Sequence, residues 1–314
     1  MQETENNNHI DGFEDEIDFL ELLNVIWQGK WLVVSFTAFV SILGVIYSLS
    51  LPNIYVSTGV LSPADTSNSI SRSLQSYAGL AGLAGVTLPS SSENNNATQA
   101  LLKLNSLSFF ESSIMPNIFL PNLMAVESWN QKTNTLSYDE RIYNKESNTW
   151  IRDYSYPRTQ IPSAQESFKT FKSNHMSLSS DKATTFITIR IKHQSPFIAK
   201  KWIELIIDEI NSYYRQKDKL DSEKAIKYLN SQIALTNLAE VRQAISQIVQ
   251  DETRKLALIE AKEYYVFEYI DPPAVMERKS EPKRAIICIL IAFLGGILSV
   301  IYVLIKHIFK KEDA

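Results

Sequence analysis

Two long apolar stretches, one near each end of the chain, dominate the pattern of hydrophobic and polar positions. Residues 31–51 and residues 285–305 each run for 21 residues without a charged side chain. A helix of that length is about 31 Å long, close to the hydrocarbon thickness of a bilayer. A buried core helix is the alternative for either stretch, but uninterrupted apolarity at both ends favours two membrane spans.

The charges around the first stretch predict its orientation and exclude a signal peptide. Residues 1–30 hold eight acidic residues and one base, Lys30, whereas a cleaved signal peptide starts with a basic segment. The next base after the stretch is Arg72, which favours a cytoplasmic N-terminus. With two spans, residues 1–30 and 306–314 are then cytoplasmic and residues 52–284 lie on the other side. The bases around the second span are ambiguous, because they stand on both sides of it.

Between the spans, alternating apolar and polar residues predict three strands. These are residues 54–62, 184–193 and 264–270. The first and last adjoin the spans, so we expect all three in one sheet near the bilayer. A helix is predicted over 97–107. Residues 127–162 are polar with interspersed aromatic residues, which pack a small sheet or, less commonly, stack on sugar rings.

The most informative stretch begins at Ser195-Pro196, a helix start with serine as N-cap and proline at the first helical position. Residues 197–271 contain neither glycine nor proline, and one helix over about 196–261 would be about 100 Å long. Such a rod cannot bury its apolar stripe alone, so it packs as a hairpin or on copies of itself. Thr236 and Asn237 interrupt the stripe, and a solvated stretch over 215–224 is a candidate hinge. The residues predicted to meet other copies are Trp202, Ile226, Leu229, Ile233, Val241, Ile245 and Ile248.

Two further patterns concern the membrane. Residues 17–27 repeat apolar side chains at spacings of three and four, which fits an amphipathic helix on the membrane surface or an extension of the first span. Small residues four apart in both spans allow helices to approach closely in lipid. These candidate packing residues are Gly44, Ser48, Ala292, Gly295, Gly296 and Ser299.

The chain is poor in recognisable chemistry. Its single cysteine, Cys288, lies in an apolar run, and its four histidines have no metal-ligand spacing in the sequence. The net charge is −4 without a basic cluster, which disfavours nucleic acid as a partner. The glycine-rich run 79–85 is not followed by the lysine of a phosphate-binding loop. We therefore predict no catalytic, cofactor-binding or metal-binding residues, no cofactor and no enzymatic activity.

Several motifs resemble those of a known family. They are the start Glu16-Ile-Asp-Phe-Leu-Glu-Leu-Leu23, the helix start His193-Gln-Ser-Pro196, the strand Glu263-Tyr-Tyr-Val-Phe-Glu-Tyr-Ile-Asp271, and Glu277-Arg-Lys-Ser-Glu-Pro-Lys-Arg284 before the second span. In this order they resemble the polysaccharide co-polymerases of the Wzz type, the O-antigen chain-length determinants. The segment that returns to the membrane carries Pro272, Pro273, Pro282 and Arg284. The family has a further proline near the position of Met276, which this chain lacks.

This resemblance implies an α+β membrane protein with two transmembrane helices, a membrane-proximal mixed α/β domain and a very long helix. It implies a bacterial inner-membrane protein with a periplasmic main domain and no kinase domain. The implied function is non-enzymatic control of O-antigen chain length by a ring-shaped homo-oligomer, an octamer by analogy. The implied partners are an integral membrane polymerase and lipid-linked polysaccharide.

Two other hypotheses come from different classes. An envelope export adaptor with a periplasmic coiled coil predicts a helical hairpin with a tight turn near Lys219–Ser222, where no Gly, Pro or Asn-Gly stands. An enzyme acting on a lipid-linked sugar needs a charged cluster at the membrane surface. Arg278, Lys279, Lys283 and Arg284 could bind a pyrophosphate carrier there, but anchoring at the interface is the plainer account of them.

Overall fold

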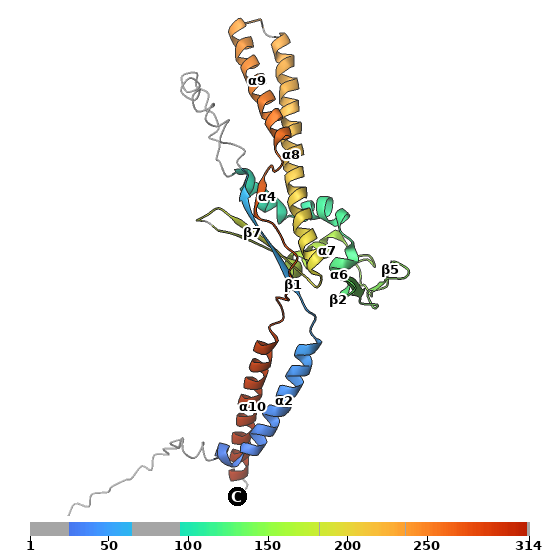
Figure 1. Cartoon of the computed structure of the whole chain (residues 1–314), viewed down its shortest axis with the longest axis vertical. Helices are drawn as coiled ribbons and strands as arrows, with labels where there is room; N and C mark the ends of the chain where they lie inside the picture. Colours follow the sequence, from blue (N-terminus) through green and yellow to red (C-terminus); the bar gives the residue numbers. More distant parts are fainter. Residues whose placement is uncertain (1–24, 65–94, 182, 236, 313–314) are drawn as a thin grey trace, which may run out of the picture. The chain divides into compact units, whose positions relative to one another are not determined.

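The computed structural model describes residues 25–64, 95–181, 183–235 and 237–312. They form two compact units, one from the described residues up to 51 and from 281 onward, and one from the described residues between 52 and 280 (Figure 1). The predicted surface helix over 17–27 and the glycine-rich run lie largely or wholly outside the described residues.

The first unit is a pair of apolar helices, α2 (Lys30–Ser50) and α10 (Arg284–Glu312). Lys30–Ser50 and Arg284–His307 are each long and apolar enough to cross a membrane. Their most apolar windows are only 11% and 17% buried, unlike the core helix of a soluble domain. The two predicted spans are therefore confirmed as exposed apolar helices, with the first starting one residue earlier than predicted.

The second unit contains a four-stranded antiparallel sheet in the order β6-β7-β1-β8. Three of its strands, β1 (Tyr55–Pro63), β7 (Ile187–His193) and β8 (Phe267–Asp271), are those predicted. The prediction that they share one sheet is confirmed. The edge strand β6 (Met176–Ser180) was not predicted, because it shows little apolar alternation.

One face of the sheet is covered by the first turns of α8 (Pro196–Leu235). Alternate residues of β7 are buried, as are four isoleucines of α8, so strand and helix periodicities meet in one core. Gly59 of β1 lies where a Cβ atom would stand 3.3 Å from Ile203 Cγ2 and 3.4 Å from Ile189 Cγ2. Its missing side chain lets the helix approach the sheet closely. The buried isoleucines of the helix are Ile203, Ile206, Ile207 and Ile210.

Short helices complete this core. In chain order they are α4 (Asn95–Leu104), α5 (Leu107–Phe109), η1 (Phe110–Ile114), η2 (Met115–Asn117), α6 (Leu120–Met124), α7 (Ala164–Thr170) and η3 (Phe171–His175). The helix predicted over 97–107 corresponds to α4, which begins two residues earlier and ends three residues earlier.

The polar region 127–162 folds into two small strand pairs. They are β2 (Val126–Asn130) with β3 (Thr135–Tyr138), and β4 (Tyr143–Asn144) with β5 (Thr149–Trp150). Tyr138 and Trp150 both contact the ring of Tyr143, at centroid distances of 5.5 and 5.3 Å. Packing of a small sheet thus explains these aromatic residues, whereas Tyr156 is 96% exposed.

The prediction of one continuous helix over 196–261 is wrong. The helix α8 ends at Leu235, and α9 (Ala239–Ala261) returns alongside it as a hairpin (Figure 1). Residues 237 and 238 are not helical, close to where the apolar stripe is interrupted, and Leu238 is extended. The predicted hinge over 215–224 is helical. Folding back buries part of the stripe within the chain, which a single helix could not do.

The segment that follows α9 is hydrogen-bonded to α8 through the buried side chain of Asn211. Its Oδ1 accepts hydrogen bonds from the backbone N–H groups of Tyr265, Val266 and Phe267, at 3.3, 2.7 and 3.0 Å. Its Nδ2 donates to the carbonyl oxygen of Phe267 at 2.9 Å. The amide thereby satisfies backbone groups that would otherwise be buried without partners. Lys219 also forms an ion pair with Glu260, between the two helices.

Candidate functional site

The small residues predicted to pack in the spans lie between the two helices of the same chain. Gly44, Ser48, Gly295 and Ser299 are buried, and Ala292 and Gly296 are half-buried. A Cβ atom on Gly44 would stand 2.7 Å from Ile291 Cγ2, and one on Gly295 would stand 2.9 Å from Val40 Cγ1. These glycines therefore allow contact that a side chain would prevent.

Two adjacent glycines give a matched test of this contact. Gly295→Ala is expected to destabilise the helix pair by about 1–3 kcal/mol, the usual cost of overpacking. Gly296→Ala is expected to be neutral, because the nearest atom to its Cβ, Thr37 Oγ1, would lie 3.9 Å away. Disulfide cross-linking of Thr37→Cys with Ser299→Cys reports the contact, with Cys288 replaced by alanine. Equal cross-linking yields for the two alanine variants would contradict this packing.

The predicted membrane-return segment runs beside the start of β1. The Ser280 N–H group donates to the carbonyl oxygen of Ile54 at 2.9 Å, and the Ser57 hydroxyl donates to that of Ala274 at 2.9 Å. Pro273 is buried, Pro272 is exposed and Pro282 is half-buried. In the other unit, Arg284 Nη2 donates to the carbonyl oxygen of Leu51 at 3.1 Å. These bonds join the two chain segments that flank the spans within each unit.

The predicted oligomer-interface residues are divided by the fold. Trp202 is only 3% exposed and lies in the core of the single chain, so a second copy cannot reach it. Four others are half-buried on the hairpin, namely Ile226, Leu229, Ile233 and Ile245. Val241 and Ile248 remain 42% and 48% exposed. The hairpin thus covers part of the stripe and leaves the rest to solvent.

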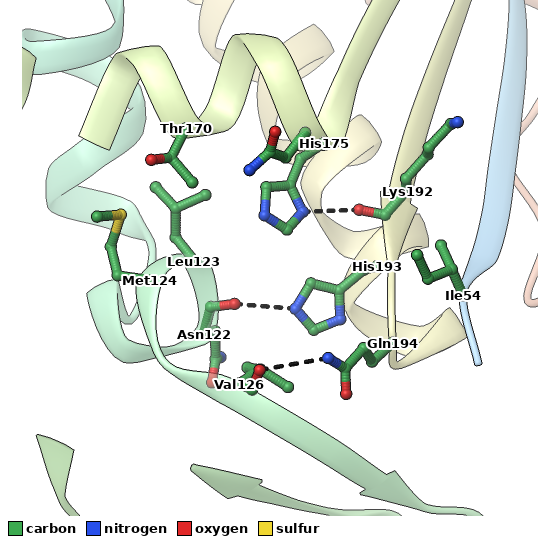
Figure 2. Close-up of a pocket in the computed structure, with 11 residues that line it drawn as sticks. Ile54, Asn122, Leu123, Met124, Val126, Thr170, His175, Lys192, His193 and Gln194 are labelled. Atoms are coloured by element: carbon green, nitrogen blue, oxygen red, sulfur yellow. Dashed lines mark hydrogen bonds between the residues drawn. The ribbon is translucent and has the colours of Figure 1, made fainter. Parts of the chain in front are cut away.

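A cavity of ≈ 280 Å³ lies beside two histidines whose proximity was not predicted from the sequence. His175, at the end of η3, and His193, at the end of β7, have ring centroids 5.8 Å apart (Figure 2). Both rings also contact buried Trp202. The pairing of β6 with β7 brings them together, which their separation in sequence conceals. The cavity is lined by Ile54, Asn122, Leu123, Met124, Val126, Thr170, Asn174, His175, Lys192, His193 and Gln194.

Hydrogen bonds fix His193 as one neutral tautomer and orient the ring of His175. His193 Nδ1 accepts from the Ser195 N–H group at 2.9 Å, so its Nε2 donates to the carbonyl oxygen of Asn122 at 2.9 Å. His175 Nδ1 donates to the carbonyl oxygen of Lys192 at 2.7 Å (Figure 2). Burial lowers the pKa of His193 to about 4, and burial also lowers the pKa of His175.

These histidines have a structural role at the start of α8. His193 receives the backbone N–H of the helix N-cap residue and connects it to α6, so it positions the end of the sheet and the beginning of the helix. Among the residues that the structure describes, no three His, Cys, Asp or Glu side chains come together as metal ligands. The motif His193-Gln-Ser-Pro196 therefore has a structural role, because it connects the end of β7 to the start of α8.

Comparison with known proteins adds the decisive observation. The family model described as "Wzz: Chain length determinant protein" matches residues 15–107. Residues 15–107 are therefore similar in sequence to the Wzz family. This confirms the resemblance drawn from the motifs. The Wzz segment covers under a third of the chain and includes α2, β1 and α4.

Two solved structures are also similar to this chain. A "full-length bacterial polysaccharide co-polymerase" is 13% identical, with a TM-score of 0.46, and the match covers 95% of this chain and 100% of that one. A "Fragment of WzzB, Polysaccharide Co-polymerase from Salmonella Typhimurium" is 10% identical, with a TM-score of 0.36, covering 73% and 100%. With scores this low, neither likeness by itself establishes a shared function. No curated protein matches the sequence.

Proposed function

We propose that this protein controls the chain length of a surface polysaccharide of the O-antigen type without catalysing the polymerisation. The Wzz match over residues 15–107 is the observation that carries the proposal. Two apolar helices support an inner-membrane location, with both termini cytoplasmic and the second unit periplasmic. The proposed partners are an integral membrane polymerase and its lipid-linked polysaccharide.

The proposal includes self-assembly into a ring, with eight subunits as the expectation from the family. Exposed apolar side chains on the hairpin support it, because such side chains gain free energy when another copy covers them. Leu238 is 67% exposed and Leu235 is 75% exposed, and Val241 and Ile248 are exposed as well. Within one chain, the packing of α8 against α9 leaves these residues uncovered.

Gene deletion with complementation tests both parts. Deletion is expected to broaden the length distribution of the polysaccharide on gels while synthesis continues, because the polymerase remains. Ile248→Glu is expected to behave like the deletion and to reduce the mass of the detergent-solubilised complex, because it places a charge in the proposed subunit contact. Gln247→Glu, at the adjacent exposed position, is expected to restore the wild-type distribution.

Loss of all polymer on deletion would contradict the proposed role as a length regulator. A wild-type complex with the mass of one chain would contradict the scaffold. Either result is readable without the other, because gels report polysaccharide and light scattering reports protein mass.

The export adaptor remains the second candidate, because the hairpin of α8 and α9 is the feature that it predicts. Its two helices are separated between Leu235 and Ala239, however, and not near Lys219–Ser222. The same deletion separates the two functions. An adaptor predicts polysaccharide of normal length that accumulates inside the cell.

A further inference from the structure

A second cavity, of ≈ 290 Å³, lies between α8 and the segment that joins α9 to β8. It shares no lining residue with the histidine cavity. Four of its residues are spaced three and four apart along α8 and therefore lie on one helix face. The lining residues are Asp208, Asn211, Ser212, Arg215, Glu263 and Tyr264.

The walls of this cavity are held in place before any ligand binds. Arg215 Nη2 donates to the carbonyl oxygens of Lys262 and Glu263, at 2.6 and 2.7 Å. Asn211 accepts hydrogen bonds from the N–H groups of Tyr265, Val266 and Phe267. A site built in advance loses less conformational entropy when it binds a ligand, so these bonds favour binding.

The cavity combines an aromatic ring with polar groups of several kinds. The ring of Tyr264 contacts that of Tyr269 edge to face, with centroids 6.1 Å apart, which fixes its orientation. Arg215 Nε is buried and has no hydrogen-bond partner among the described residues. A buried donor of this kind is satisfied by an oxygen atom placed in the cavity.

The charge of the cavity selects among ligands that carry such oxygens. Two carboxylates, Asp208 and Glu263, face one guanidinium, so the lining is net negative. Burial raises the pKa of Asp208, and the neighbouring charge of Glu204 raises it further. Phosphates and acidic sugars are repelled by this lining. Hydroxyl groups suit it, because they donate to carboxylates and accept from guanidinium.

We propose that this cavity binds one neutral sugar residue, whose apolar C–H face packs on Tyr264 while its hydroxyl groups bond to Asp208 and Arg215. The inference rests on the proposed function, because it names the class of polysaccharide unit that the chain contacts. The volume of ≈ 290 Å³ lies at the lower end for ligand pockets and suits one pyranose ring.

Saturation-transfer NMR on the full chain in lipid nanodiscs tests the site, since maltoside detergents carry sugar head groups. N-acetylglucosamine and its tetramer serve as neutral probes and galacturonate as the acidic one. The neutral probes are expected to bind, whereas galacturonate is not expected to bind. Tyr264→Ala is expected to weaken neutral-sugar binding by about tenfold, through loss of the aromatic contact. Ser212→Trp, at an exposed position on the rim, is expected to abolish binding by filling the cavity.

Tyr156→Ala is the matched control, because this tyrosine is 96% exposed and lies outside the cavity. The double variant Asp208→Asn, Glu263→Gln is expected to admit galacturonate. Wild-type chain that binds no neutral probe, or equal binding by the Tyr264→Ala and Tyr156→Ala variants, would overturn the assignment. The polysaccharide gels of the deletion strain report the proposed function independently, so failure of the sugar site leaves that test unaffected.

Discussion

Replacing Asn211 with alanine is expected to destabilise the second unit by about 3 kcal/mol. The change removes the acceptor of three backbone N–H groups and the donor to Phe267, and one unsatisfied buried donor alone costs about 1–3 kcal/mol. For a unit of this size the expected fall in Tm is about 10 °C. Circular dichroism of the full chain in nanodiscs measures it.

Asn230→Ala is the control for this prediction, because Asn230 lies on the same helix at an exposed position. It is expected to leave Tm unchanged. Asn211→Asp keeps the acceptor oxygen but loses the donor, so its Tm should lie between those of the wild type and the alanine variant. If Asn211→Ala melts at the wild-type temperature, this side chain does not fasten the hairpin.

Acidification from pH 6.5 to pH 4 is expected to remove about 3 kcal/mol of stability through His193 alone. The pKa of His193 is lowered to about 4 in the folded chain, against an ordinary value of 6.5. The folded state therefore binds fewer protons, and its stability is complete above pH 6.5 and falls as the pH drops toward 4. Each unit of pKa difference corresponds to about 1.4 kcal/mol. His175, whose pKa is lowered too, acts in the same direction.

Melting temperatures at pH 6.5, 5.5 and 5 measure this effect together with that of His175, while the raised pKa values of Asp208 and Glu209 act in the opposite direction. Glu166 and Asp181 also have lowered pKa values, but they contribute only near and below their ordinary values of 4.5 and 3.8. His193→Gln retains a neutral donor for the Asn122 carbonyl group and is expected to melt earlier at pH 6.5 with a flatter pH dependence. An unchanged pH dependence in this variant would assign the acid sensitivity to other groups.

The way in which the hairpin divides the apolar stripe matters for the proposed oligomeric scaffold. The helix α8 is about 60 Å long at 1.5 Å per residue, and α9 covers one side of it. Half-buried Ile226 and Ile245 belong to the packing between the two helices, whereas exposed Ile248 is available to another copy. Hairpin stability and subunit contact therefore depend on different parts of one apolar stripe. Substitutions at Ile226 are consequently expected to affect the stability of the hairpin, whereas substitutions at Ile248 are expected to affect the contact between subunits.

Local patterns in the sequence determined the elements whose signal is local. Twenty-one apolar residues predict a span, alternation predicts β1, β7 and β8, and Ser195-Pro196 predicts the start of α8, because burial of one face imposes each period. Only the tertiary structure decided where the long helix breaks, which partners bury Trp202, and that Asn211, His175 and His193 have their partners far away in sequence. Those outcomes depend on strand register and on which surfaces pack together. Contacts between residues that are distant in sequence produce no periodic pattern along the chain, so the sequence alone does not predict them.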